Sequence, residues 1–251
     1  MNLGEPIAIG NTAKIYLHDG KIIKVFNDHL PDTEAEYETN KQKLAHAYGL
    51  PVPHIYEVTK VNGKQAIVME HIKGDTIGSL LFADRSKAKQ YTDLSVDIQL
   101  KIHAVKAPGL EWMSDKLSRQ ITSAHQLDDK QKNALLERLD AIKYDPYLCH
   151  GDYHVFNLIL NENQVVIIDW VDASSGDVRA DVCRTYLLYA QFSADLADLY
   201  LRLYCDKSGI RQDEIFLWAP VIAGARLSEH VSSEKASRLI EIVNKYCPKM
   251  V

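Results

Sequence analysis

The chain has few cysteines, no long apolar run and no excess of positive charge. Its 251 residues include four cysteines, and no two of them form a CxxC pair. This spacing favours reduced thiols over a disulfide framework or a zinc site. The formal net charge of −5 argues against a nucleic-acid groove, which usually needs a basic face. We therefore expect no nucleic-acid partner.

Targeting and membrane-spanning patterns are also missing. The opening residues MNLGEPIAIGNTAKIY hold no basic region followed by an apolar run, and no apolar stretch approaches the ~18 residues that span a bilayer. We expect a cytoplasmic protein with no membrane partner. Hydrophobic residues make up 46% of the chain and charged residues 25%, as in ordinary soluble domains. The length suits one large domain or two small lobes.

The first seventy residues alternate short apolar runs with turn residues. Asp-Gly at 19–20 and Asn-Gly at 62–63 each separate two apolar runs, a pattern typical of β-hairpins. Between the hairpins, Thr33 followed by Glu36 fits a helix capping box, and Gly49 fits the end of that helix. These signals predict a small lobe of strands with one helix, which we place at residues 1–72.

The rest of the chain, residues 73–251, has a mainly helical pattern. Leu94, Ile98 and Ile102 recur at four-residue spacing, as do similar positions in later segments. The exception is a short predicted hairpin, with strands at 158–160 and 165–168. The predicted fold class is therefore α+β, with a larger, mainly helical C-terminal lobe.

The stretch CHGDYHVFN, residues 149–157, concentrates polar side chains and allows two kinds of chemistry. His150, Asp152 and His154 alternate along an extended segment, so a metal-dependent hydrolase is one interpretation. Such a site needs further ligands, and the other histidines form no paired ligand motif. We therefore keep the hydrolase as the less favoured alternative.

Phosphoryl transfer is the second interpretation, and it explains more of the chain. It requires a carboxylate beside the acceptor hydroxyl, oxygen ligands for Mg²⁺ and a lysine on the phosphates. Asp152 and Asn157 both precede the predicted hairpin, and its second strand ends in Asp169. Because a hairpin turns the chain back, we expect Asp169 to lie close to Asn157.

The N-terminal lobe offers a lysine for the phosphates. Lys24 lies in the middle of the predicted strand KIIKVF, where a charge is costly without a partner. Glu34, Glu36 and Glu38, on the following helix, are candidate partners. The loop at residues 10–12 could fold over phosphates through its backbone N–H groups.

These residues together resemble the aminoglycoside phosphotransferase and choline kinase group of small-molecule kinases. HGDYHVFN is similar to the catalytic loop HGDxHxxN of that group, and VVIIDW is similar to its metal-binding strand. GNTAKIY and KIIKVF resemble the nucleotide loop and the lysine strand, and VMEHIKG resembles the hinge between lobes. The resemblance covers nearly the whole chain and implies a bilobal protein-kinase-like fold.

The resemblance also implies roles for individual residues. Asp152 would be the catalytic base or hydroxyl-orienting carboxylate, and Asn157 and Asp169 would hold Mg²⁺. The implied nucleotide-binding residues are Gly10, Lys24, Glu38, Met69, Glu70, Ile72 and Ile168. The enzyme would move the γ-phosphoryl group of ATP or GTP to a hydroxyl of a small molecule. His150, His154, His103 and Asp181 are expected to support the structure, Asp181 by bracing the loop after Trp170.

The acceptor is the least determined part. Asp172, Trp218 and Glu229 are candidate acceptor-binding residues, and Asp172, Glu229 and Glu234 could form an acidic cleft for an amine-bearing alcohol. The sequence leaves open an aminoglycoside, choline-like, thiamine-like or sugar acceptor. It also leaves open the choice between ATP and GTP, a role in antibiotic resistance or metabolism, and the oligomeric state.

Two rival functions use the same fold. A protein kinase is disfavoured because Gly151 stands where protein kinases carry arginine, IDW replaces DFG, and no APE-like segment follows. A non-catalytic nucleotide-binding module remains an alternative, although the chain retains every acidic, amide and lysine residue that the motif requires.

Overall fold

The computed structural model describes residues 3–162, 164–229 and 234–246, and the chain forms two compact units. The first unit comprises residues 1–83 and 155–172, and the second comprises residues 84–154 and 173–251. The first unit thus includes the hairpin that sequence analysis assigned to the second lobe. The division into functional lobes at residue 72 stays a prediction.

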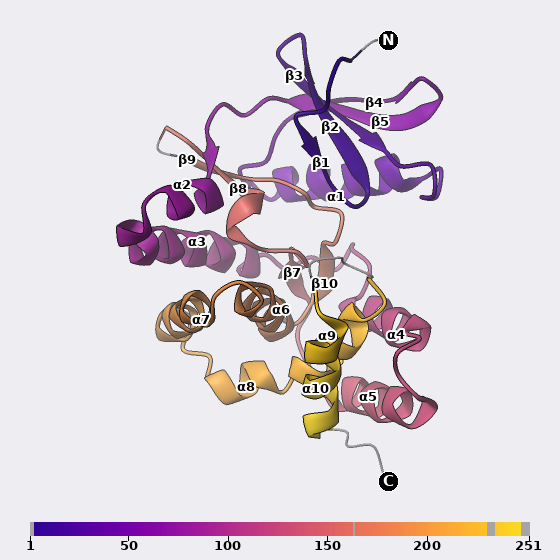
Figure 1. The fold of residues 1–251 in the computed structure, drawn as a ribbon, viewed down its shortest axis with the longest axis vertical. Helices are drawn as coiled ribbons and strands as arrows, with labels where there is room; N and C mark the ends of the chain where they lie inside the picture. The colour runs from indigo at the N-terminus through magenta and orange to yellow at the C-terminus, as the bar shows by residue number, and fades with distance from the viewer. Residues whose placement is uncertain (1–2, 163, 230–233, 247–251) are drawn as a thin grey trace. The chain divides into compact units, whose positions relative to one another are not determined.

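A five-stranded antiparallel sheet forms the main part of the first unit (Figure 1). Its strands, in spatial order, are β1 (Ala8–Ile9), β2 (Ala13–His18), β3 (Lys21–Phe26), β5 (Lys64–Glu70) and β4 (Ile55–Val61). Both predicted hairpins are present. Asp19 and Gly20 have φ values of 48° and 73°, and Asn62 and Gly63 have 50° and 84°. Two successive left-handed residues make the tight turn that suits twisted strands.

Helix α1 (Glu34–Ala47) packs on β4 and β5, and Figure 1 shows it alongside the sheet. The predicted capping box is wrong, because Thr33 has φ −100° and ψ 0° and its side chain makes no capping hydrogen bond. The predicted end is present. Gly49 has φ 78°, and the amide of Leu50 donates to the carbonyl of Ala45.

A smaller three-stranded sheet completes the first unit, in the order β6 (Asp75–Thr76), β8 (Leu158–Asn161) and β9 (Gln164–Ile167). The 3₁₀ turn η2 (Val155–Asn157) leads into β8 and packs on α2 (Ile77–Ala83). Gly78 of α2 is required there, since an added Cβ would lie 2.6 Å from the ring of Phe156. This packing fixes the segment that carries Asn157.

The second unit is mainly helical, and helices α4, α5, α6 and α10 pack on α9 (Ala219–Arg226), whose residues are all buried. Asp128 forms a capping box with Gln131 at the start of α5, and Ser193 caps α7. Two short strands, β7 (Tyr147–Cys149) and β10 (Ser174–Gly176), pair antiparallel. The helices are α3 (Ala88–His103), α4 (Met113–Ser123), α5 (Asp129–Ala141), α6 (Val178–Ala190), α7 (Ala194–Ser208), α8 (Gln212–Phe216), α9 (Ala219–Arg226) and α10 (Ala236–Tyr246), after the 3₁₀ turn η1 (Arg85–Lys87).

The predicted fold class, α+β with an N-terminal antiparallel sheet and a mainly helical C-terminal part, is confirmed. Within the described residues, no helix combines the length and the apolar character that a bilayer crossing needs.

Candidate active site

Lys24 is the centre of a buried ion-pair cluster in the first unit. Its Nζ lies 2.7 Å from Oε1 of Glu38 and 2.9 Å from Oδ1 of Asp169. Strand β3 directs Lys24 to this point, paired with Ile15 on one side and Ile67 on the other. The lysine and Glu38 are almost fully buried, whereas the side chain of Asp169 is 38% exposed. Asp169 is therefore the carboxylate of the cluster that faces solvent.

The cluster keeps Lys24 charged despite its burial. Burial alone would lower the pKa of Lys24, but the charges of Asp169 and Glu38 raise it above its ordinary value. Burial also raises the pKa of Glu38, against the effect of Lys24. The Oε2 atom of Glu38 is buried and has no hydrogen-bond partner among the described residues. One lysine is thus shared between two carboxylates, and Oε2 of Glu38 has no hydrogen-bond donor among the described residues.

Asn157 and Asp169 flank the β8–β9 hairpin. Leu158 pairs with Ile167, and the amide of Ile168 donates to the carbonyl of Asn157 at 3.0 Å. Asp169 follows directly, with φ 64°, a left-handed conformation that aspartate tolerates better than most residues. The hairpin register therefore brings the backbone of Asn157 next to the turn that presents Asp169.

Two hydrogen bonds from side chains to backbone carbonyls stabilise the turn after β9. The Nζ of Lys41, on α1, donates to the carbonyl of Val171 at 2.6 Å and lies over the ring of Tyr37. The indole Nε1 of Trp170 donates to the carbonyl of Ile167 at 3.3 Å. Lys41 is buried and lies one helical turn beyond Glu38. Helix α1 thus contacts the Asp169 turn indirectly, through Lys24, and directly, through Lys41.

The other predicted nucleotide-binding residues vary in availability. Met69 is part of the core between the sheet and α1, and the amide of Glu70 is already bonded to the carbonyl of His54 at 2.8 Å. Ile72 and Ile168 are half-buried, and Gly10 is exposed in the β1–β2 turn, where its amide donates to the carbonyl of Ala13. Their binding roles stay predictions.

Asp152 lies in the second unit between two cationic or potentially cationic groups. Its Oδ2 is 3.5 Å from Nε2 of His154, and its Oδ1 is 3.8 Å from Nη2 of Arg184. Burial alone would raise the pKa of Asp152, but His154, Arg184 and His150 hold it well below its usual range. The carboxylate is 27% exposed and stays ionised near neutral pH.

Asp181 supports the loop that carries Asp152. Its Oδ1 accepts the amide of Gly151 at 2.8 Å, and its Oδ2 contacts Nε2 of His103 at 3.0 Å. Gly151 has φ 82°, which explains why glycine is needed there. Sequence analysis expected Asp181 to brace the loop after Trp170. Within the second unit the residue instead holds the loop that precedes Asp152.

The predicted acceptor-binding residues differ in their surroundings. Trp218 has no exposed surface, and its indole donates to Oδ2 of Asp177 at 3.0 Å, so it is a core residue. Glu229 makes a two-point pair with Arg184, at 2.6 and 3.1 Å, and is not a free acidic group. Asp172 lies in the first unit and is half-buried.

Arg184, Arg226 and Lys41 were not predicted from the sequence. Arg184 had no local signal, because its partners Asp152 and Glu229 are distant from it in the sequence. Arg226 is the only charged residue of the α9 sequence APVIAGAR, and a lone charge in an apolar helix needs an explanation. Lys41 had no signal, because its partner is a backbone carbonyl distant in sequence.

The metal-hydrolase alternative receives no support from the described part of the chain. No group of three or more His, Cys, Asp or Glu side chains there is arranged to hold a metal ion. His150 is fully buried against Tyr153 and accepts the amide of Asp152 on its Nδ1 at 3.3 Å. Its observed contacts are those of a loop-supporting residue.

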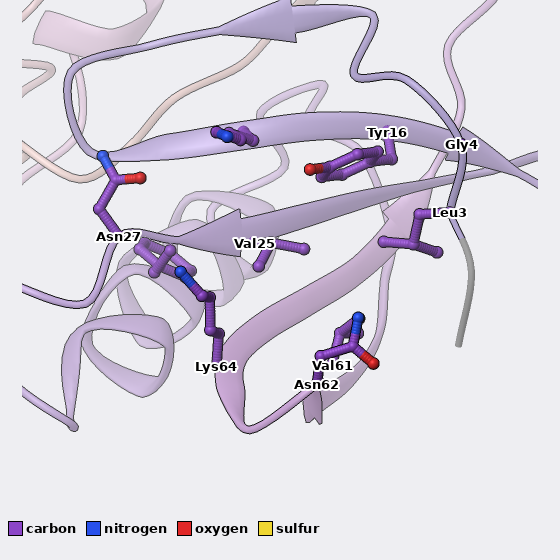
Figure 2. Close-up of a pocket in the computed structure, with 10 residues that line it drawn as sticks. Leu3, Gly4, Tyr16, Val25, Asn27, Val61, Asn62 and Lys64 are labelled. Carbon is purple, nitrogen blue, oxygen red and sulfur yellow. The ribbon is translucent and has the colours of Figure 1, made fainter.

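A hollow of about 290 Å³ opens on the N-terminal sheet (Figure 2). Tyr16, Val25 and Leu3 border it, as Figure 2 shows. Successive residues of a strand point to opposite faces of a sheet, so Val25 and Lys24 do not share a face. The hollow therefore lies on the face opposite the Lys24 cluster and contributes nothing to it.

Solved structures with the same fold include three aminoglycoside phosphotransferases. A thermostable mutant of APH(4)-Ia, in complex with ADP and hygromycin B, has a TM-score of 0.73 at 12% identity, covering 96% of this chain and 92% of that one. ADP-bound APH(2'')-Ib has a TM-score of 0.63 at 16% identity, with 98% and 92% covered. Aminoglycoside-3'-phosphotransferase of type VIII has 0.64 at 18%, with 90% of each chain covered. A comparison with curated proteins finds no match.

The chain thus has the fold of these aminoglycoside phosphotransferases. The model of the phosphotransferase enzyme family matches residues 4–218, which is most of the chain. The chain therefore belongs to the phosphotransferase enzyme family, and the predicted family and enzyme class are confirmed.

Proposed function

We propose that this enzyme transfers the γ-phosphoryl group of a purine nucleoside triphosphate to a hydroxyl group of a small molecule. The observation that carries the proposal is the Lys24 cluster, where one buried lysine is shared by Glu38 and Asp169. A lysine held in this way by a helix carboxylate is available to bind phosphate oxygens. Structures with the same fold contain ADP or AMP-PNP, which favours ATP as donor.

Asn157 and Asp169 are the proposed metal-holding residues. A carboxamide and a carboxylate supply the oxygen ligands that Mg²⁺ prefers, and both residues flank one hairpin. The solvent-facing carboxylate of Asp169 suits a metal that also binds phosphate. When bound, Mg²⁺ would offset the negative charge of the triphosphate.

Asp152 is the proposed partner of the acceptor hydroxyl. In the reaction the hydroxyl oxygen forms a bond to the γ-phosphorus, the bond between that phosphorus and the β–γ bridging oxygen breaks, and the nucleoside diphosphate leaves. The hydroxyl proton passes to the Asp152 carboxylate and then to solvent. Because the pKa of Asp152 is lowered, the carboxylate is a weak base that mainly orients the hydroxyl and accepts its proton late.

The test is ADP release by the purified protein with Mg²⁺, ATP and a library of small alcohols. Acceptor-dependent ADP release by the wild type, and its loss by at least ~100-fold in Asp152→Asn, is the expected result. Tight Mg-ATP binding without acceptor-dependent turnover across the library would favour the non-catalytic module instead.

A further inference from the structure

Asp152 borders a group of charged side chains that we call the arginine cluster: Arg184, Arg226, Glu229, Glu234 and Arg238. All of them belong to the second unit. Arg184 is 3.8 Å from Asp152, and Arg226 is close enough that Asp152, Arg184, Glu229 and Glu234 all affect its pKa. The sequence predicted an acidic cleft, whereas the cluster contains three arginines and two glutamates.

Both glutamates of the cluster are already neutralised. Glu229 binds Arg184 through two oxygens and accepts a hydrogen bond from Nε2 of Gln120 at 3.2 Å. Glu234 binds Nη2 of Arg226 at 2.9 Å and two nitrogens of Arg238 at 3.0 and 3.1 Å. Two-point pairs of this kind are the strong form of the arginine–carboxylate contact. Neither carboxylate is therefore available to the ammonium group of an amine-bearing acceptor.

Two nitrogens of the Arg226 side chain have no hydrogen-bond partner among the described residues. Arg226 is 4% exposed, and its Nε and Nη1 are buried without a hydrogen-bond partner in the described part of the chain. Buried donors without an acceptor are costly, so a position of this kind calls for an explanation. Burial, and then the like charge of Arg184, lowers the pKa of Arg226 against the opposing effect of Glu229, Glu234 and Asp152.

The charges of the cluster do not balance without Asp152. Three arginines face two glutamates, and the remaining carboxylate is the one proposed to orient the acceptor hydroxyl. An anionic group on the acceptor would supply a hydrogen-bond acceptor for the buried N–H groups of Arg226 that have no partner among the described residues. A polycationic amino sugar would instead bring ammonium groups towards three guanidinium groups.

We propose that the acceptor is an alcohol bearing a carboxylate or a phosphate, and that Arg184 and Arg226 recognise this anionic group beside Asp152. This inference rests on the proposed function and specifies its substrate class. Guanidinium groups match the planar or forked oxygens of both anions. Arg184, at 11% exposed, is the more accessible arginine of the pair, and Arg226 adds charge and donors.

The experiment compares matched alcohols in the ADP-release assay. Glycerate and glycerol 2-phosphate represent anionic acceptors, glycerol is the neutral match, and an amino alcohol and an aminoglycoside represent cations. We expect kcat/KM for at least one anionic alcohol to exceed that of its neutral match by about 10-fold or more, as for charge-assisted hydrogen bonds. The carboxylate and phosphate arms identify which anion is preferred.

Variants separate recognition from structural support. Arg226→Gln should lower kcat/KM for the anionic acceptor by about 10- to 100-fold, mainly through KM. Arg238→Gln is the matched control, because Arg238 binds the same Glu234 but is more exposed and is not one of the two arginines assigned to the anionic group, and it should retain kcat/KM. Equal losses in both variants would mean that Arg226 only supports the fold, and would overturn its assignment. If Arg226→Gln does not fold, the wild-type comparison still decides.

The possible outcomes distinguish this inference from the proposed function. Turnover confined to neutral or cationic alcohols would overturn the anionic acceptor and leave phosphoryl transfer intact. ADP release with none of the acceptors would count against both. A preference for anionic alcohols that weakens as salt is added would support Arg184 and Arg226 as the recognition site.

Discussion

The sharing of Lys24 between two carboxylates makes a quantitative prediction about Glu38→Gln. The substitution keeps the size of the side chain and removes its charge, so Lys24 retains only Asp169 as an ionic partner. A buried hydrogen bond to a charged group contributes roughly 1.5–3 kcal/mol to the free energy of unfolding. Asp169 compensates poorly, because its carboxylate is 38% exposed and water weakens the attraction. We expect a loss of about 2 kcal/mol.

The measurement is thermal unfolding of Glu38→Gln, with Glu36→Gln as control. In a chain of this size, 1 kcal/mol shifts Tm by about 2–4 °C, so Glu38→Gln should lower Tm by about 4–8 °C. Glu36 is exposed on the same helix, and its substitution should change stability by no more than ~0.5 kcal/mol. Equal Tm values for the two variants would refute the claim that the Lys24–Glu38 pair is a buried, coupled interaction.

Two further predictions concern the residues that support the site. Lys41→Met removes the hydrogen bond to the Val171 carbonyl, so the Asp169 turn should loosen and the Kd for Mg-ATP should rise by about 10-fold. The control Lys43→Met changes an exposed lysine of the same helix and should leave the Kd unchanged. Equal Kd values for the two variants in a calorimetric titration would contradict the role of Lys41. Asp181 has a lowered pKa in the folded state, so its contribution to stability is present above its ordinary pKa of 3.8 and is lost as pH falls through the folded value. Asp181→Asn should therefore be less stable at pH 7 and show a weaker decrease of Tm between pH 5 and pH 3, and a parallel decrease in both proteins would argue against a buried charge.

Local patterns in the sequence were sufficient to predict most of the first unit. Asp-Gly and Asn-Gly between apolar runs predicted both hairpins, because the turn geometry depends on residues adjacent in the chain. The placement of Lys24 in a strand and of Asp169 at a strand end followed from the same kind of pattern. The partner of Lys24 was less certain. Glu34, Glu36 and Glu38 differ only in which face of α1 they occupy, and packing on the sheet decides that.

The surroundings of Glu229 and Trp218 could not be predicted, because their contacts join residues far apart in the sequence. Glu229 looked like an available carboxylate, but its pairing with Arg184, 45 residues earlier, is a tertiary contact. Trp218 was a candidate acceptor-binding residue, but it is a core residue whose indole donates a hydrogen bond to Asp177. Helical spacing predicts which side chains share one face of a helix. Which charged side chains contact each other depends on how the helices pack.

The most direct test of the account compares Mg-ATP binding and phosphoryl transfer in two variants, Asp152→Asn and Lys24→Met. Asp152→Asn should bind Mg-ATP with nearly the Kd of the wild type and lose acceptor-dependent ADP release by at least ~100-fold. Lys24→Met should weaken Mg-ATP binding itself, because it removes the charge held by Glu38 and Asp169. Full turnover in Asp152→Asn, or an unchanged Kd in Lys24→Met, would contradict the assignment of these residues to acceptor and donor.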